Sequence, residues 1–290
     1  MLPWVIFIIM YTTQYYYCMF THSRMTHTSS RKNPHQIIVH GNADSIWSSN
    51  YVASRPLKVI VHGWNNNGDS PMNSQITAAF LKMQDCNVIV VDWRTLAHSF
   101  YPTAVAGVPS VGKQLGNFLI WLVNTAGGNW DSMHLVGFSL GAHIVGYAGR
   151  QTGGQPARIF PGLDPAGPFW NNSNALNKTA GQYVEIIHTD SGFLGISKRV
   201  GHADFYPNGG KHPQPGCSPL DSLCSHGRAL ELFASSVRTD HFVGRLCPNT
   251  IGDAELSTCF GAAFNMGNGI ITKRGLLFGF YMMTTLSTNL

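Results

Sequence analysis

MHLVGFSLGAHIVGYA, residues Met133–Ala148, joins a short apolar run to a longer segment with the pattern of a helix. Its centre, Gly137 to Gly141, has the form Gly-x-Ser-x-Gly. This pattern predicts a strand, a sharp turn and a helix, with Ser139 at the apex and glycine on both sides because the apex backbone is strained. The turn exposes the Ser139 hydroxyl to a base. It also places the Leu140 amide at a helix N-terminus, where it can stabilise an oxyanion.

Apolar runs of strand length alternate with helical spacing along the chain, which predicts an α/β fold with a mostly parallel central sheet and helices on both faces. Gly201–Ser225 is rich in Gly, Pro and Asp and is expected to be a loop. Leu276–Met283 is expected to close the same domain. The expected strands are Leu57–His62, Asn87–Asp92, Met133–Val136, Ala157–Leu163 and Tyr183–His188, and the expected helix is Ser110–Asn124.

Charged residues make up only 11% of the 290 residues, hydrophobic residues 44%, and the net charge is +5. With 31 Gly and 15 Pro, this composition favours a compact, loop-rich domain over a disordered chain. No block of Lys and Arg occurs of the kind that binds nucleic acid, so no nucleic-acid partner is expected.

The first 23 residues contain no Asp, Glu, Lys or Arg, and Leu2–Met10 is almost wholly apolar. This favours a signal peptide or leader over residues 1–17, with one domain over 18–290, although no basic segment precedes the apolar run. A signal anchor is the alternative, because the uncharged stretch exceeds 18 residues.

A hydrolase built on this turn takes its acid and then its base from segments further along the chain. Asp164 ends an expected strand, and Pro165 prevents further pairing; Asp190 is a rival at the end of the next strand. Cys224 could tether the loop that carries His226. The candidate bases are His188, His202, His212, His226 and His241.

The second oxyanion donor is expected in a loop after an early strand. Val61-His62-Gly63-Trp64 is such a loop, because Gly63 permits a tight turn and leaves the Trp64 amide as donor.

Several ordered blocks resemble those of the animal pancreatic-lipase family, within the α/β-hydrolases. They are His62–Trp64, Val90–Trp93, Gly137–His143, Gly162–Pro168, Ile187–Asp190 and Gly201–Gly210. The resemblance implies an α/β-hydrolase fold with a single lipase domain. It also implies Ser139 as nucleophile, Asp164 as acid and His226 as base, with Trp64 and Leu140 as oxyanion donors and with Asp190 and His202 as structural residues.

The lid is the first departure from pancreatic-type lipases. Only Ser218, Pro219, Leu220, Asp221, Ser222 and Leu223 lie between Cys217 and Cys224. A lid this short leaves an open cleft. In this feature the chain resembles insect-type secreted phospholipases A1. The resemblance implies action on the sn-1 ester of phospholipids at a membrane or micelle interface. Alternatives are a triacylglycerol or galactolipid lipase, and a non-enzymatic lipid-binding protein of the yolk type.

Six cysteines at this density suit disulfide bonds in an exported protein. Cys217 with Cys224 and Cys247 with Cys259 could each close a small loop. This leaves Cys18 and Cys86 for a long-range bridge. A zinc site of Cys217, Cys224 and His226 is the alternative.

Ala175–Gly181, where similar lipases place calcium ligands, has no carboxylate, so no metal and no cofactor are expected. Asn171 and Asn177 begin glycosylation sequons, which matter only in an exported chain. The chain ends at Leu290 without the β-sandwich that binds colipase in pancreatic-type lipases. The expectation is a secreted monomer without colipase.

Overall fold

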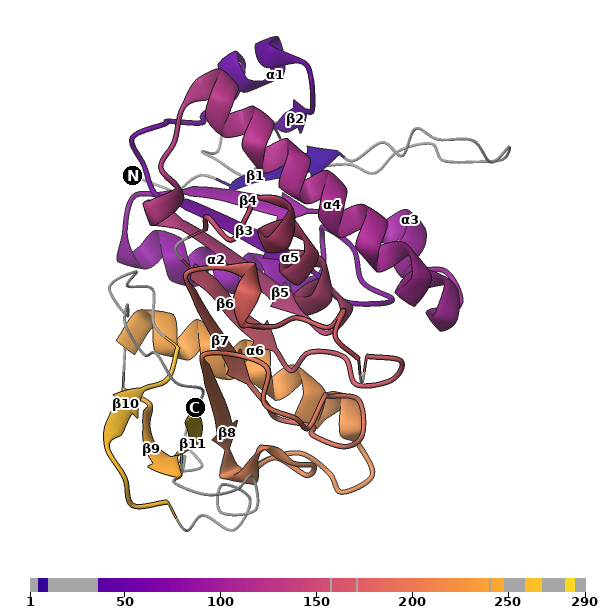
Figure 1. The fold of residues 1–290 in the computed structure, drawn as a ribbon, viewed down its shortest axis with the longest axis vertical. Coiled ribbons are helices and arrows are strands. Elements are labelled where there is room, and N and C mark those ends of the chain that lie inside the picture. The colour runs from indigo at the N-terminus through magenta and orange to yellow at the C-terminus, as the bar shows by residue number, and fades with distance from the viewer. Residues whose placement is uncertain are drawn as a thin grey trace.

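The computed structural model describes residues 5–9, 36–156, 158–170, 172–239, 241–247, 259–267 and 280–284. Its strands form one sheet in the order β10-β9-β11-β8-β7-β6-β5-β3-β4-β1-β2 (Figure 1). Neighbours from β11 through to β2 run parallel, while β9 is antiparallel to β10 and β11. The strands are β1 Val5–Ile9, β2 Ile37–Val39, β3 Leu57–Val61, β4 Asn87–Val91, β5 Met133–Phe138, β6 Arg158–Leu163, β7 Tyr183–Ile187, β8 Ala203–Pro207, β9 Val243–Cys247, β10 Ala263–Asn265 and β11 Phe280–Thr284.

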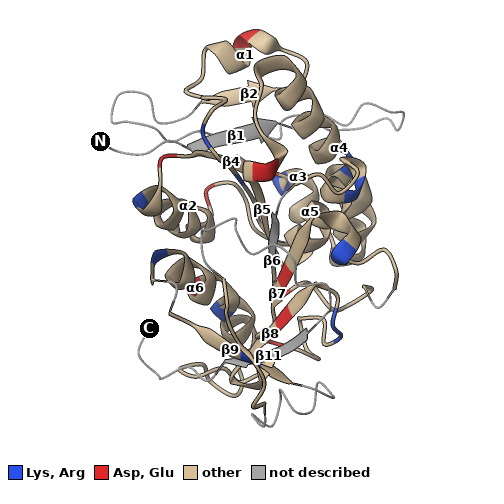
Figure 2. Ribbon diagram, turned by 60° about the vertical axis from the view of Figure 1, so that its left-hand side comes forward, with Lys and Arg blue, Asp and Glu red and all other residues tan. Residues whose placement is uncertain are grey.

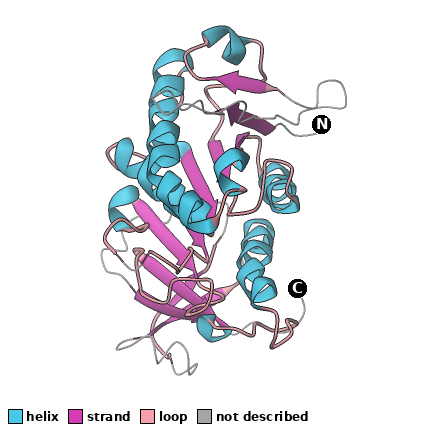
Figure 3. Ribbon diagram, turned by 90° about the vertical axis from the view of Figure 1, so that its right-hand side faces the viewer, coloured by secondary structure: helices cyan, strands magenta, loops and turns pink. Residues whose placement is uncertain are grey.

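Helices cover both faces of the sheet (Figure 3). Helices α4 and α5 pack against each other on one face, and α2 and α6 on the other. The helices are α1 Ala43–Trp47, α2 Pro71–Met83, α3 Arg94–Ala97, α4 Tyr101–Ala126, α5 Leu140–Gln151 and α6 Ser222–Thr239, with short 3-10 turns η1 Trp130–Ser132, η2 Lys178–Ala180 and η3 Asn208–Gly210.

The central strands are buried on both faces, as parallel strands between two helical layers must be. Every residue of β3, β4, β5 and β7 is buried. The predicted fold class is therefore confirmed, with strand limits within two residues of those expected.

The expected loop Gly201–Ser225 was wrong in part. It contains β8, and α6 begins at Ser222. The sequence of β8 includes Asp204, which gives the segment a polar character, yet this carboxylate is buried and paired with His188, whose Nε2 lies 2.9 Å from Oδ1. The helix expected over Ser110–Asn124 also starts earlier, at Tyr101, because a proline in its first turn needs no N–H partner.

Two buried carboxylates lie inside the sheet, and Figure 2 shows the acidic positions within β7 and β8. On β7, Glu185 accepts hydrogen bonds from the Tyr183 hydroxyl (2.8 Å) and the Gly267 N–H (2.6 Å). On β8, Asp204 also accepts from the N–H groups of Val200 and Gly201, both at 3.0 Å. Each charge is therefore compensated within the fold.

Residues Val5–Ile9, expected within the leader, form β1, which pairs with β2 and β4. A run of Val, Ile and Phe has the composition of a signal segment and equally that of a buried parallel strand, and hydropathy cannot separate the two. In the described part of the chain, no helix combines the length and apolar character needed to cross a bilayer.

Candidate active site

Ser139 occupies a strained turn between β5 and α5. Its φ of 55° and ψ of −121° are unfavourable for a residue with a side chain. A Cβ on Gly137 would collide with the Gly141 backbone, and one on Gly141 with the carbonyls of Val61 and His62. Both positions therefore require glycine, and the turn presents Ser139 at the carboxyl edge of the sheet.

Asp164 and His226 form a buried pair at the same edge. Asp164 follows β6, and its Oδ2 lies 2.6 Å from Nδ1 of His226. The other oxygen, Oδ1, accepts from the N–H groups of Thr189 (2.8 Å) and Asp190 (3.2 Å). The carboxylate therefore holds the Nδ1–H tautomer of the imidazole and leaves Nε2 as the basic atom.

His226 lies beside the strained turn. Its ring centroid is 4.6 Å from that of Phe138, the residue before Ser139. The Ser139 hydroxyl forms no hydrogen bond with His226 in the described structure. Contacts of this kind often tighten only when substrate binds. The geometry brings nucleophile, base and acid candidates to one place.

Two backbone N–H groups next to Ser139 donate to no acceptor among the described residues, namely those of Trp64 and Leu140. Leu140 is the first residue of α5, where no intrahelical acceptor exists. Trp64 belongs to the loop after β3, and a Cβ on the preceding Gly63 would lie 2.9 Å from the Ser139 Cβ. The expected oxyanion donors therefore flank the turn.

The family model named Lipase matches residues 19–270. The chain belongs to this lipase family. Pancreatic lipase-related protein 2 of Sus scrofa is 34% identical over 77% of this chain and 53% of its own length. The Homo sapiens protein of that name is 34% identical over 81% and 55%. Lipoprotein lipase of Gallus gallus is 36% identical over 69% and 46%. The chain thus spans about half the length of these relatives.

Among solved structures, an α/β hydrolase enzyme from a deep-sea metagenome library matches with a TM-score of 0.34 at 17% identity, covering 50% of this chain and 60% of that one. A likeness this weak carries no argument. The parallel sheet and the lipase family together give the α/β-hydrolase fold expected from the sequence.

Asp190 lies close to the pair without contacting the imidazole as Asp164 does. Its Oδ2 accepts from the Ser222 hydroxyl (2.5 Å) and the Leu194 N–H (3.0 Å), and burial raises the pKa of its carboxyl. One ligand atom each of Asp164, Asp190 and His226 falls within 4.8 Å of the others. Oδ2 of Asp164 and Nδ1 of His226 are bonded to each other, and Oδ2 of Asp190 is bonded to Ser222, so the grouping is a carboxylate–imidazole pair with a second carboxylate beside it.

The other four candidate histidines, all among the described residues, form no hydrogen bond with Asp164. His188 binds Asp204, and the Nδ1 of His202 accepts from the Val184 N–H at 2.9 Å. His212 lies 3.1 Å from the Ser225 hydroxyl, and His241 is exposed beyond α6. Of the five candidate histidines, His226 is the one whose ring contacts Asp164 and packs beside Phe138, next to Ser139.

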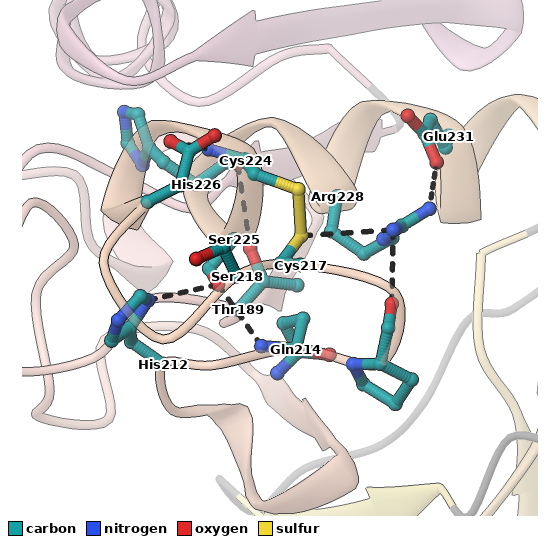
Figure 4. The surroundings of a disulfide bond; sticks show 12 residues. Thr189, His212, Gln214, Cys217, Ser218, Cys224, Ser225, His226, Arg228 and Glu231 are labelled. Atoms are coloured by element: carbon teal, nitrogen blue, oxygen red, sulfur yellow. Dashed lines mark hydrogen bonds and ion pairs between the residues drawn. A yellow bond between two sulfur atoms is a disulfide. The ribbon is translucent and has the colours of Figure 1, made fainter.

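His226 was expected in a tethered loop, but it lies in the first turns of α6. Figure 4 shows how this end of the helix is fixed: His212 and Gln214 converge on Ser225, next to His226. The Gln214 N–H donates to the Ser225 hydroxyl at 3.0 Å. A helix positions the imidazole more firmly than a loop would.

Thr189 belongs to the site, although it was not singled out from the sequence. Besides its N–H bond to Asp164, its hydroxyl donates to the His226 carbonyl at 3.4 Å. Two signals could have found it: its place directly after an expected strand, and its position within the block Ile187–Asp190.

The lid segment, Ser218–Leu223, lies between the bonded cysteines Cys217 and Cys224 and consists of a short loop followed by the first residues of α6. It is anchored at several points: the Asp221 carboxylate accepts from the Cys224 N–H (3.0 Å), the Pro219 carbonyl lies 2.7 Å from His212, and Ser222 binds Asp190. Ser222 and Leu223 belong to α6. These contacts leave no hinged flap.

The Cys217–Cys224 and Cys247–Cys259 bridges are confirmed. Sulfur atoms bonded to each other cannot serve as zinc ligands, which removes the zinc alternative. The third expected bridge was wrong, because Cys86 is a free, buried thiol whose pKa burial raises to about 11. Its partner in that expectation, Cys18, lies outside the described residues.

Asn177 caps the turn η2, and its Oδ1 accepts from the Thr179 N–H at 3.0 Å. Asn171 lies outside the described residues. The stretch that lacks calcium ligands lines a cavity of about 440 Å³ with Lys178, Lys198 and Arg199. The described lining holds no carboxylate, and a cationic wall of this kind does not suit calcium.

His143 on α5 gives an expected pH dependence of stability. It is fully buried, its Nδ1 accepts from the Leu176 N–H at 3.0 Å, and burial lowers its pKa to about 3. Between about pH 6.5, the ordinary His pKa, and about pH 3, the imidazole is protonated in the unfolded chain but not in the native state. The free energy of unfolding therefore decreases as the pH is lowered through this range. His143 contributes about 1.4 kcal/mol per pH unit in this window. The measurement is the free energy of unfolding of the wild type and of His143→Gln between pH 7 and 5. An equal dependence on pH in the two proteins would contradict this account.

Proposed function

We propose that this protein is a serine hydrolase of glycerolipid esters, with Ser139 as nucleophile, His226 as base and Asp164 as the acid that orients it. The observation that carries the proposal is the 2.6 Å Asp164–His226 contact beside a strained serine. Two N–H groups without described acceptors complete the arrangement that acyl transfer needs.

In the first half of the reaction, Oγ of Ser139 attacks the ester carbonyl while Nε2 of His226 takes the hydroxyl proton. The carbonyl oxygen becomes an oxyanion, held by the Trp64 and Leu140 N–H groups. Each such donor is worth about 3 kcal/mol of barrier. Asp164 stabilises the imidazolium.

Collapse of this intermediate breaks the ester C–O bond, and the imidazolium protonates the leaving alcohol. In the second half, His226 takes a proton from water, and the resulting hydroxide attacks the acyl-enzyme. The proton then returns to Oγ of Ser139, which releases the fatty acid.

The short anchored loop favours phospholipids and a phospholipase A1 reaction at the sn-1 ester. Six residues between the disulfide cysteines cannot cover an acyl groove. A site that no flap covers would admit a bulky charged headgroup. A neutral-glyceride or galactolipid lipase is the alternative; the names of the relatives say only that they are lipases.

Exposed apolar side chains lie in the loops that follow β3, β4, β6 and β7 and around the start of α6, and all of these segments except the loop after β4 also carry site residues. Trp64 follows β3, the ring centroid of Tyr101 is 5.3 Å from that of Trp64, and Leu220 in the disulfide loop is 97% exposed. This arrangement supports contact with a lipid surface. The set, here called the apolar rim, consists of Trp64, Phe100, Phe169, Phe193, Leu220 and Leu223.

Two disulfides support export to an oxidising compartment. Export would allow glycosylation at Asn171 and Asn177. We also propose action as a monomer without colipase.

The test of the proposed function is fatty-acid release from phosphatidylcholine with different labels at sn-1 and sn-2, beside a triacylglycerol emulsion. We expect sn-1 release that Ser139→Ala abolishes, with little attack on the emulsion. Dominant emulsion hydrolysis would favour the neutral-lipid alternative. A folded protein that releases nothing from any ester would favour the lipid-binding alternative.

The apolar rim gives a separate prediction. Leu220→Asp places a charge on the most exposed apolar side chain of the rim. We expect activity on phospholipid vesicles to fall about tenfold, which corresponds to about 1.4 kcal/mol of lost interfacial binding. Activity on a soluble short-chain ester should persist. Lys113→Asp, on helix α4, is the charge-change control; equal loss in both variants would contradict the role of the rim.

A further inference from the structure

His62 is a buried histidine that immediately precedes the expected oxyanion loop. Its side chain is inaccessible to solvent, and its Nδ1 lies 2.9 Å from the carbonyl oxygen of Gly63. The Trp93 N–H donates to Nε2 at 3.2 Å. Nδ1 therefore has the Gly63 carbonyl as its polar partner, while Nε2 faces the Trp93 N–H and, at 3.5 Å, the Asp92 carboxylate.

These partners determine the tautomer. A carbonyl oxygen can only accept, so Nδ1 must carry the hydrogen toward Gly63. The Trp93 N–H can only donate, and at 3.2 Å it lies nearer to Nε2 than the Asp92 carboxylate does at 3.5 Å, so Nε2 is the bare nitrogen. The neutral Nδ1–H form satisfies both contacts.

The Gly63 carbonyl and the Trp64 N–H belong to the same peptide unit. The cis bond recorded among the described residues is His212–Pro213, so the Gly63–Trp64 peptide is trans. In a trans peptide, C=O and N–H point in opposite directions. A carbonyl held by the His62 ring therefore turns the Trp64 N–H away from that ring.

We propose that His62 is a positioning residue, whose Nδ1–H fixes the Gly63–Trp64 peptide with the Trp64 N–H aimed at the oxyanion that forms on Ser139. The inference rests on the proposed function. The backbone of Gly63 lies next to Ser139, since a Cβ at position 63 would lie 2.9 Å from the Ser139 Cβ. Only the rotation of one peptide plane then decides whether the site has two donors or one.

His62 is itself held rigidly by Trp93. The indole N–H of Trp93 donates to the His62 carbonyl at 2.7 Å, and the two rings stack with centroids 5.6 Å apart and an interplanar angle of 15°. Behind them, Asp92 lies 3.5 Å from Nε2 and binds the Arg94 guanidinium. An imidazole fixed in this way can impose its direction on the peptide.

The test compares His62→Asn with His62→Gln. The amide nitrogen of Asn occupies the place of Nδ1 and can donate to Gly63, whereas the Gln amide reaches the place of Nε2. Both remove the ring, so both carry a similar packing cost. For a soluble ester we expect His62→Gln to lower kcat about 100-fold with little change in KM, and His62→Asn to lose much less. The Ki of a trifluoromethyl ketone, which forms a tetrahedral oxyanion with the serine, should rise with the loss of kcat.

Equal losses in the two variants, or a loss carried by KM, would overturn the proposal. A second measurement needs no variant: ring-nitrogen NMR shifts of His62 in the wild-type protein should report the neutral Nδ1–H tautomer, and the Nε2–H tautomer would overturn it. Absence of any esterase activity in the wild type would instead contradict the proposed function. The comparison of His62→Asn with His62→Gln tests only the role of His62.

Discussion

Ser139→Ala is expected to remove ester hydrolysis almost completely, by about 10⁶-fold in kcat. The variant loses the only atom that can form the acyl-enzyme, while the oxyanion donors and the substrate contacts remain. Residual hydrolysis above the uncatalysed rate would come from those groups. The measurement is kcat on a soluble short-chain ester, which avoids the complications of an interface.

Ser191→Ala is a matched control. Ser191 is buried in the loop after β7 and plays no part in the proposed reaction. We expect its kcat to remain near that of the wild type. Alanine keeps the Cβ and therefore the same backbone strain at position 139, so the thermal stability of Ser139→Ala should change little. Activity that survives Ser139→Ala would rule out this serine as the nucleophile.

Asp164→Asn is expected to lower kcat by about 10⁴-fold. An Asn side chain fits the same space, but its NH₂ group can face Nδ1 of His226 and favour the wrong tautomer. The imidazolium would also lose its negative partner. Both the change of tautomer and the loss of charge are expected to be large, because the carboxylate oxygen lies 2.6 Å from Nδ1 of the ring.

Asp190→Asn tests whether the effect of Asp164 comes from its contact with His226 or from any negative charge near the imidazole. Asp190 lies within the same cluster, yet its Oδ2 binds Ser222 and Leu194 rather than the imidazole. We expect it to lower kcat by less than about tenfold, through the anchoring of α6. Comparable losses for Asp164→Asn and Asp190→Asn would contradict the assignment of Asp164 as the acid.

The strands nearest the site could be predicted because each is a continuous apolar run that ends at a turn residue. Gly137 and Gly141 also carried enough information to place the turn, since no other residue fits there. Such local signals need no knowledge of distant partners.

Other features depend on partners far away in the sequence. The strand around Asp204 was mistaken for loop because its burial requires His188, 16 residues earlier. The pairing of Val5–Ile9 with β4 could not be predicted either, because nothing local in the sequence shows it. The choice of His226 among five histidines, and of Asp164 over Asp190, needed the resemblance, since local chemistry left them open.

The central claim is that Ser139 is a nucleophile activated by His226 and Asp164. The most direct test is mass spectrometry of the wild-type protein after reaction with a fluorophosphonate, which phosphonylates activated serines. The account predicts a single adduct on Ser139, formed far more slowly in His226→Ala and Asp164→Asn. An adduct on another serine, or none on the folded protein, would contradict it.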